Sequence, residues 1–304
     1  MSIPVIGFDE GEALLDWLPL TDALAAGHTL PRAEIADTFL YRGADTLLNR
    51  AAWIDGLGLA VKSATIFPGN AARHRPAVNG GVSLYSDTDG TLEAMVDFHL
   101  VTKWKTAGDS LLAARRLARA DSRRILIVGA GTVARSLRES YGAGFPGASF
   151  EVWNRTNAAA ATIAAEYPDT RMVIDLEAAV AEADIVACAT MTTAPILRGD
   201  WLSNGTHVDL IGAYRPDMRE ADDRVLQRGT LFVDSRDSTL DHIGELRIPR
   251  EAGVIGPEDV VADYYDLPKF VRRSDEEITV FKNGGGAHLD LMTARHILDM
   301  WRAR

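Results

Sequence analysis

A strand, a tight glycine turn and a helix follow one another in residues 124–143, and this segment constrains the fold most strongly. The apolar run at 125–128 predicts a buried strand of a parallel sheet. Gly129 permits the turn, Gly131 lets the backbone approach a phosphate, and Ala134 replaces a third glycine where the helix packs on the strand. Free N–H groups at the start of the helix favour an anion. We therefore predict a dinucleotide site that includes Gly129, Gly131, Thr132 and Val133.

Strand and helix signals alternate from residue 121 to residue 283. Apolar runs predict the strands, and helical patterns fall between most of them. This alternation indicates the α/β class, with a Rossmann-type doubly wound parallel sheet covered by helices on both faces. The predicted strands are 125–128, 149–153, 172–174, 184–189, 207–211 and 231–233, and the predicted helices are 132–143, 157–166, 176–183 and 220–228.

Residues 1–120 carry a different pattern and predict a separate α+β domain. A strand is expected at 59–67, a hairpin at 82–86 and 92–96, and a helix at 102–120. A glycine run, 284–286, precedes one last helix at 287–301. Because that helix follows a finished sheet and has nothing of its own to pack on, we expect residues 284–304 to return to the first domain and make it discontinuous.

Charge and composition exclude several classes of protein. The net charge of −11 leaves no basic footprint of the kind that nucleic-acid binding usually needs. The single cysteine, Cys188, lies in an apolar strand, which suits packing and a reducing cytoplasm. No secretory signal or bilayer-spanning run is evident, and the seven histidines lack metal-ligand spacing. We expect a cytoplasmic protein with a small-molecule substrate, no metal and no membrane or nucleic-acid partner, and we expect His207 to be a hydrogen-bonded core residue.

The end of the second predicted strand bears on the choice of cofactor. An NAD enzyme usually carries Asp or Glu there, whereas this chain has Asn154, Arg155 and Thr156. Arg155 can pair with a 2′-phosphate, and its neighbours can donate hydrogen bonds to it. This pattern favours NADP(H), with NAD(H) still possible if Arg155 is only a surface residue. Thr190, after the strand 184–189, and Gly285 complete the candidate cofactor contacts.

Eight segments in a fixed order carry a further signal, at 58–62, 68–70, 102–108, 129–131, 153–156, 211–220, 232–235 and 278–282. With them the chain resembles the ornithine cyclodeaminase/mu-crystallin family over nearly its whole length. The resemblance implies a homodimer whose N-terminal strands pair across the interface, with an active site between the domains of each subunit. Residues 1–120 would then bind substrate and form the dimer. Members include cyclodeaminases, alanine dehydrogenases and reductases of cyclic imino acids, and the Asn154–Thr156 segment looks like the NADPH-using mu-crystallin branch.

The resemblance also assigns a site for the substrate carboxylate, on Arg42, Lys62 and Lys105. Lys105 stands where the family usually has arginine, which keeps the charge but loses the bidentate fork. Tyr214 stands where cyclodeaminases have an aspartate for the second amino group of their substrate. A neutral phenol cannot accept an ammonium as a carboxylate can, so Tyr214 argues against cyclodeamination.

These residues suggest reduction of a cyclic ketimine such as pyrroline-2-carboxylate or piperideine-2-carboxylate. NADPH would give hydride to the C=N carbon, while Lys62 serves as proton donor or electrostatic stabiliser. Three other functions remain open: ornithine cyclodeamination with NAD, an alanine-dehydrogenase-like reaction, and a non-catalytic protein that binds NADPH and a ligand. Simpler structural interpretations also remain, with Lys62 and Lys105 as solvated lysines and Tyr214 packing against Pro216.

Overall fold

The computed structural model describes residues 3–304, which divide by their internal contacts into two compact units. Unit 1 comprises the chain through Lys105 together with Gly285–Arg304, and unit 2 comprises Thr106–Gly284. The division falls inside helix α3 (Phe98–Leu117) rather than at the expected junction near residue 121. The helix is continuous across it: Trp104 stacks on Trp17 in unit 1, whereas Ser110 accepts a hydrogen bond from Asn283 in unit 2.

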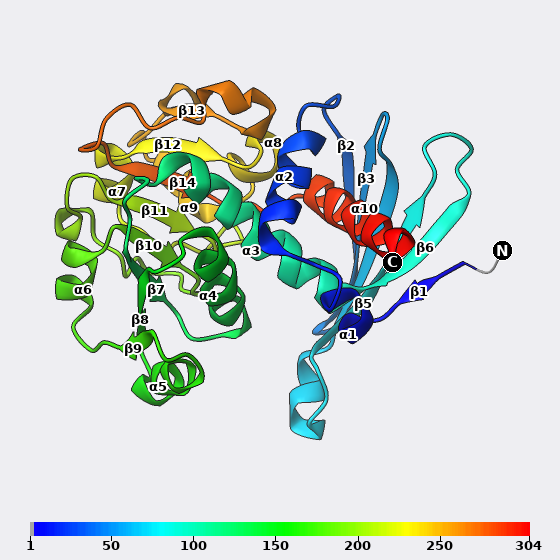
Figure 1. Cartoon of the computed structure of the whole chain (residues 1–304), viewed down its shortest axis with the longest axis horizontal. Helices are drawn as coiled ribbons and strands as arrows, with labels where there is room; N and C mark the ends of the chain where they lie inside the picture. Colours follow the sequence, from blue (N-terminus) through cyan, green and yellow to red (C-terminus); the bar gives the residue numbers. More distant parts are fainter. Residues whose placement is uncertain (1–2) are drawn as a thin grey trace. The chain divides into compact units, whose positions relative to one another are not determined.

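Unit 1 is built on a six-stranded sheet in the order β1-β6-β5-β4-β3-β2. Neighbouring strands are antiparallel except for the parallel pair β1 and β6. Alternate residues of β4 are buried beneath the C-terminal helix α10 (Ala287–Ala303), which also packs on α2 (Trp17–Gly27; Figure 1). The remaining elements are β1 (Val5–Ile6), α1 (Phe8–Glu12), β2 (Glu34–Arg42), β3 (Asp45–Ile54), β4 (Gly58–Ile66), η1 (Pro68–Arg73), β5 (Val78–Tyr85) and β6 (Leu92–Asp97).

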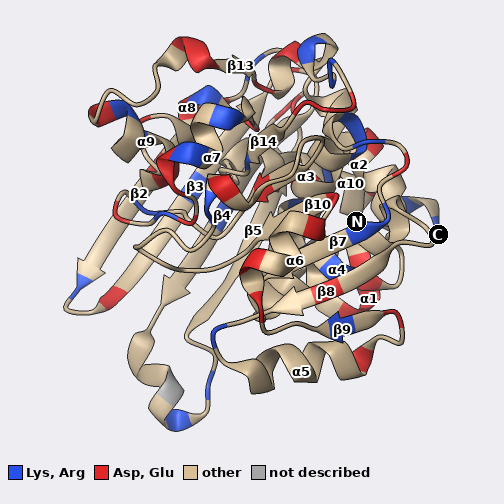
Figure 2. Cartoon of the chain, turned by 90° about the vertical axis from the view of Figure 1, so that its left-hand side faces the viewer, with Lys and Arg blue, Asp and Glu red and all other residues tan. Residues whose placement is uncertain are grey.

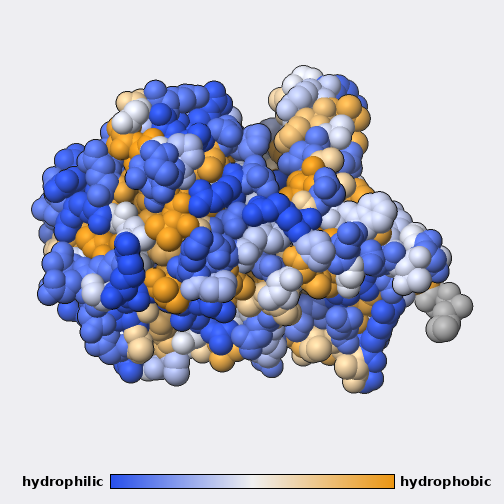
Figure 3. Space-filling model, turned by 90° about the horizontal axis from the view of Figure 1, so that it is seen from above, coloured by the Kyte–Doolittle hydropathy of each residue, from blue (hydrophilic) through white to orange (hydrophobic). Residues whose placement is uncertain are grey.

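Strand β2 is an exposed edge of this sheet. All nine of its residues are exposed, including the large apolar side chains of Ile35, Phe39 and Leu40. Orange patches of hydrophobic residues interrupt the mostly hydrophilic surface in Figure 3. A long edge with unpaired backbone groups and apolar side chains is a template for pairing with another chain.

Unit 2 contains an eight-stranded parallel sheet in the order β13-β12-β14-β11-β10-β7-β8-β9, which confirms the predicted α/β class with a Rossmann-type sheet. Strand order reverses between β7 and β10, so a topological switch point lies there. The prediction ended the sheet at 231–233 and missed β13 and β14. The strands are β7 (Arg124–Val128), β8 (Ser149–Trp153), β9 (Thr170–Met172), β10 (Ile185–Cys188), β11 (His207–Leu210), β12 (Thr230–Val233), β13 (Val260–Ala262) and β14 (Thr279–Lys282).

Helices of unit 2 cover both faces of this sheet. Val208 and Leu210 of β11 share one apolar cluster with residues of α6 and α7, whereas Asp209 between them meets Tyr141 of α4 on the opposite face. Basic and acidic residues occur on several of these helices, whereas α5 is almost uncharged (Figure 2). They are α4 (Thr132–Gly144), α5 (Asn157–Glu166), α6 (Leu176–Glu182), η2 (Gly199–Trp201), α7 (Asp223–Arg228), α8 (Arg236–Thr239), α9 (Gly244–Glu251), η3 (Pro257–Asp259) and η4 (Tyr264–Lys269).

Two residues expected in the core are found there. Cys188 is fully buried in the apolar cluster of unit 2, and burial raises the pKa of its thiol well above the usual value. The His207 ring is buried with Nδ1 2.9 Å from the Thr279 hydroxyl, and burial lowers the pKa of the imidazole to about 3. Among residues 3–304, no helix is long and apolar enough to cross a membrane, and no group of His, Cys, Asp or Glu side chains could hold a metal ion.

Asp209 is a buried carboxyl group whose ionisation opposes folding. Tyr141 donates a hydrogen bond of 2.7 Å to its Oδ2, yet burial dominates and raises the pKa of Asp209 to about 7 from 3.8. Because the folded chain holds this proton more tightly than the unfolded chain, its contribution to stability is complete below pH 3.8 and is lost as the pH rises through about 7.

Replacing Asp209 by Asn should remove this titration. Relative to the Asp209→Asn variant, we expect the wild type to lose about 1.4 kcal/mol of unfolding free energy per pH unit between roughly pH 4 and 7. Urea unfolding at pH 5, 6 and 7 measures the difference, with Asp121→Asn as an exposed control. A difference that stays constant over this range would show that Asp209 is ionised throughout.

Candidate active site

The glycine turn after β7 lies at the switch point of the unit 2 sheet. Gly129 has a φ of 120°, and a Cβ there would lie 2.6 Å from the carbonyl oxygen of Ala189, so this position requires glycine. Its N–H donates a 2.8 Å hydrogen bond to the carbonyl of Trp153, at the end of β8. The turn therefore lies beside the ends of both β8 and β10.

The N-terminus of helix α4 is open to a ligand. Gly131, its N-cap, is exposed, and no protein atom lies within 4 Å of the place where a Cβ on it would stand. No side chain caps the helix, and its first turn carries no acidic residue. Since the fold itself does not need glycine at position 131, the residue leaves room for the close approach of a pyrophosphate. The open space and the uncapped helix N-terminus fit the pyrophosphate of a dinucleotide cofactor.

The polar residues after β8 lie next to this turn, because Trp153 pairs with Val128 in the register of β7 and β8. The Asn154 side chain donates a 3.0 Å hydrogen bond to the carbonyl of Thr156 and so closes a small loop. Arg155 is exposed at its tip. Among the described residues none forms an ion pair with Arg155, so its guanidinium is available to a phosphate.

Lys62 is a buried cation in unit 1 and not a solvated strand lysine. Its ammonium donates to the Thr102 hydroxyl at 2.8 Å and to Asp290 Oδ1 at 2.9 Å, and lies 4.6 Å from the centre of the Phe98 ring. Asp290 is almost fully buried on α10, and its Oδ2 accepts no hydrogen bond from residues 3–304. The carboxylate therefore depends on neighbouring cations.

Lys105 and Arg50 extend this cluster. Lys105 Nζ lies 3.7 Å from Asp290 and donates to the carbonyl of Gly285 at 2.5 Å, and Arg50 Nη1 donates to the same carbonyl at 3.0 Å. Burial raises the pKa of Asp290, but attraction to Lys105, Lys62 and Arg50 outweighs it and holds the pKa below its usual value. Arg50 also pairs with Asp37 at 3.1 Å. Three cations thus act on the single buried carboxylate of Asp290.

Three of the predicted site residues lie apart from the residues with which they were grouped in the prediction. Arg42 ends β2, where its side chain is 80% exposed and pairs with Asp45, several residues along the sheet from Lys62. Gly285 was predicted among the cofactor contacts, but it lies in unit 1 and its carbonyl binds Arg50 and Lys105. Tyr214 lies in unit 2 and is 59% exposed after β11, with its ring facing Arg215.

Sequence reasoning missed Arg50 and Asp290. Arg50 pairs directly with Lys62 in the register of β3 and β4, so their side chains share a face, but this signal needs the strand β3 to be recognised first. Asp290 is an acid between the apolar residues Leu289 and Leu291 in the last helix. A buried acid in an apolar segment signals a cationic partner, but the sequence does not say which one.

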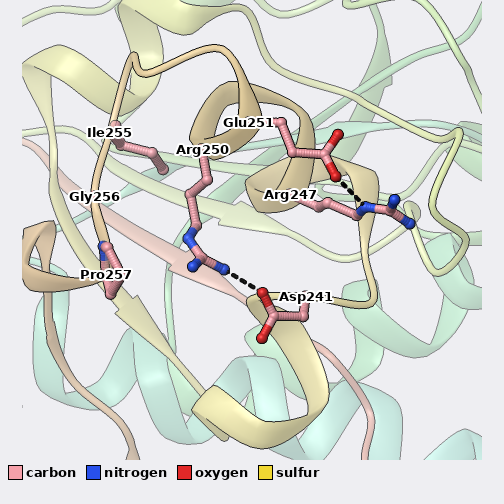
Figure 4. Close-up of a pocket in the computed structure, with 7 residues that line it drawn as sticks. All are labelled: Asp241, Arg247, Arg250, Glu251, Ile255, Gly256 and Pro257. Atoms are coloured by element: carbon pink, nitrogen blue, oxygen red, sulfur yellow. Dashed lines mark hydrogen bonds and ion pairs between the residues drawn. The ribbon is translucent and has the colours of Figure 1, made fainter.

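One cavity lies elsewhere in unit 2 (Figure 4). It measures about 610 Å³ and is lined by α9, by Asp241 before that helix and by the loop after it. Arg250 pairs with Asp241 at 2.7 Å, and Arg247 pairs with Glu251 at 2.7 Å. Because the carboxylates that pair with these arginines also line the cavity, it offers little net charge to a ligand, and we do not assign the active site to it.

A nucleotide-type turn in one unit and a buried cationic cluster in the other define a cofactor-dependent α/β protein. The model of the ornithine cyclodeaminase/mu-crystallin family matches residues 54–304, and the chain belongs to this family. It is 50% identical over 300 residues to the Delta(1)-pyrroline-2-carboxylate reductase of Paracoccus denitrificans (strain Pd 1222), covering 96% of this chain and 95% of that protein. It is 32% identical over 245 residues to the ketimine reductase mu-crystallin of Mus musculus, covering 80% and 76%.

A solved structure shares the whole architecture. An archaeal alanine dehydrogenase dimer with bound NAD matches with a TM-score of 0.90 at 26% identity, covering 100% of this chain and 97% of that chain. Both units of the chain therefore have counterparts in a known dehydrogenase.

The pairing of Lys62 with Asp290 can be tested through stability. Lys62→Met leaves a buried carboxylate without its nearest cation and should cost about 3–5 kcal/mol of unfolding free energy. Adding Asp290→Asn should recover a large part of that loss in urea unfolding. Arg302 lies on the same helix as Asp290, is half-exposed and pairs with Glu93 of β6, so Arg302→Gln should cost no more than about 1 kcal/mol. Strictly additive losses in the double variant would contradict the pairing.

Proposed function

We propose that this chain is an NADPH-dependent reductase of cyclic ketimine carboxylates, with pyrroline-2-carboxylate as the first substrate to test. The observation that carries the proposal is the cluster of three basic side chains, Lys62, Lys105 and Arg50, that acts on the buried carboxylate of Asp290. Such a cluster suits a small anionic substrate and not a cationic one. The 50% identity to a pyrroline-2-carboxylate reductase over almost the full length of both chains supports the same substrate class.

The protein's own groups would bind and polarise the imine acid. Lys105 would hold the carboxylate by charge, and Lys62 would lie near the C=N bond. There its ammonium, itself held by Thr102 and Asp290, stabilises developing charge or gives a proton to the ring nitrogen. NADPH, when bound, supplies the hydride that the imine carbon accepts. Hydride and proton together convert C=N to CH–NH, which gives a cyclic amino acid.

The cofactor would be held by unit 2. The backbone of Gly129, Gly131, Thr132 and Val133 would bind the pyrophosphate at the helix N-terminus, and Thr190 lies beside this turn. Arg155 would pair with the 2′-phosphate of NADPH, with Asn154 and Thr156 beside it. NADH would lose that ion pair, so we propose a preference for NADPH, although the archaeal relative in its solved structure binds NAD.

The first experiment follows NADPH absorbance with pyrroline-2-carboxylate and repeats the assay with NADH. We expect consumption of NADPH, faster than that of NADH, and loss of most turnover in Lys62→Met at a temperature where the variant is folded. Consumption that requires added ammonia and a 2-oxo acid would favour an amino-acid dehydrogenase. Ammonia release from ornithine would favour cyclodeamination, which the neutral Tyr214 argues against. Tight NADPH binding without turnover would favour a ligand-binding protein.

The same assay tests whether Arg155 recognises the 2′-phosphate of NADPH. Arg155→Ala removes a charged hydrogen-bonding partner worth about 1.5–3 kcal/mol, so KM for NADPH should rise about tenfold or more while KM for NADH changes little. Arg171→Ala, which breaks an exposed pair with Glu151, serves as the control. An equal change for both cofactors would contradict recognition of the 2′-phosphate by Arg155.

We also propose that the chain is a homodimer that pairs through β2. This edge exposes all nine residues, and a shallow apolar groove of about 390 Å³ on the adjacent sheet face includes Ile35 and Trp53. The archaeal relative is a dimer. We expect light scattering to give twice the mass of one chain, and Leu40→Glu to shift the protein towards the monomer, whereas Val271→Glu on unit 2 should not. A wild-type mass of one chain would refute the dimer.

A further inference from the structure

A buried carboxylate in unit 2 joins two loops at the carboxyl edge of its sheet. Glu220 is fully buried. Its Oε1 accepts hydrogen bonds from the N–H of Thr190 at 2.6 Å and from the Thr190 hydroxyl at 2.8 Å. Its Oε2 accepts from the N–H groups of Gly212 at 2.6 Å and Ala213 at 3.3 Å. One side chain thus holds the segment after β10 and the segment after β11.

A second buried carboxylate, that of Glu245, fixes the backbone at Glu220. The N–H of Glu220 donates to Glu245 Oε2 at 2.7 Å, and the N–H of Ala221 donates to Glu245 Oε1 at 2.9 Å. Burial raises the pKa of Glu220, while the positive charge of Lys282 and the donors on Thr190 oppose that rise. N–H groups of both loops point at the two oxygens of Glu220, so only a group that accepts at both ends satisfies them.

The two loops are in direct contact. A Cβ on Gly212 would lie 1.8 Å from the carbonyl oxygen of Thr190, so only glycine lets the backbones approach this closely. The first loop borders the glycine turn, because a Cβ on Gly129 would meet Ala189 at 2.6 Å. The second loop carries Tyr214. In parallel α/β sheets, ligands bind at this edge, beyond the carboxyl ends of the strands.

We propose that Glu220 is a positioning residue for the bound dinucleotide: its carboxylate fixes the loops of Thr190 and Gly212 in the arrangement that holds the cofactor. The proposal rests on the cofactor site assigned under the proposed function, but not on the imine as substrate. Glu220 touches no reacting atom and acts through the loops. It also links a candidate cofactor contact, Thr190, to the loop of a candidate substrate contact, Tyr214, through one group.

The test compares Glu220→Gln with a matched control, Asp222→Asn. Glutamine has nearly the same shape, but its NH₂ end would face N–H donors and release one of the two loops. Asp222 is also a carboxylate that accepts two backbone N–H groups, from Gly199 at 2.9 Å and Val225 at 3.1 Å, but it bonds neither loop. NADPH fluorescence on the full chain gives Kd without any need for turnover, and thermal unfolding monitors the fold of both variants.

We expect Glu220→Gln to raise Kd and KM for NADPH about tenfold or more, with a much smaller change in KM for the imine acid. Asp222→Asn should keep the wild-type Kd even if its Tm falls. A merely structural role for Glu220 would lower Tm and the active fraction and leave Kd and KM unchanged, and that result overturns the proposal. If the wild type binds NADPH but reduces no imine, the proposed reaction fails while the comparison of Kd still decides the role of Glu220.

A second variant covers the case in which Glu220→Gln does not fold. Glu245→Gln would place an NH₂ against the N–H of Glu220 or of Ala221, so it should move the backbone of Glu220 and weaken the bonds of its carboxylate to both loops. We expect its Kd for NADPH to rise in the same direction by a smaller factor. An unchanged Kd in a folded Glu245→Gln protein would then overturn the proposal.

Discussion

The ion pair between Lys62 and Asp290 is the interaction on which the organisation of unit 1 depends. It joins β4 to a helix that follows more than 200 residues later, and α3 adds Lys105 to the same carboxylate. Either charge alone would be costly to bury, so the sheet and the C-terminal helix each need the other. The pair therefore gives one physical reason for the C-terminal helix to pack on the sheet of unit 1. It also holds the cations at a fixed place, which a binding site for a small anion needs.

Short segments of the sequence were sufficient to predict elements that form through interactions between residues close together in the chain. The turn at Gly129, the strand at 149–153 and the helix at 157–166 were predicted from such segments and are found. Strand β14 was missed because it has only four residues and begins and ends with polar side chains. Its place between β11 and β12 is fixed by partners that lie about 50–70 residues earlier, and no local pattern encodes them.

The candidate site likewise contains residues that the sequence can identify and residues that it cannot. Residues that bind through the backbone, such as Gly129 and Gly131, can be found from sequence because the turn itself requires their type. Residues that act by charge depend on register and burial. Arg50 becomes a neighbour of Lys62 only when β3 pairs with β4. Arg42, eight residues earlier, lies at the end of β2, where the pairing of β2 with β3 places it opposite Asp45. The prediction named Arg42 as the third cation, and in the structure Arg50 lies beside Lys62.

This division also explains why membership of a family does not fix the reaction. The backbone turn of unit 2 serves any nicotinamide dinucleotide, so it is compatible with hydride transfer, with cyclodeamination and with ligand binding alone. The choice falls to a few side chains, above all the charge at Tyr214 and the balance of charge around Asp290. A carboxylate at position 214 would attract a second ammonium group, whereas a phenol does not. Within unit 1, basic side chains that act on one buried carboxylate suit an anionic ligand better than a diamino acid, and on this ground we propose the reduction of a ketimine acid rather than cyclodeamination.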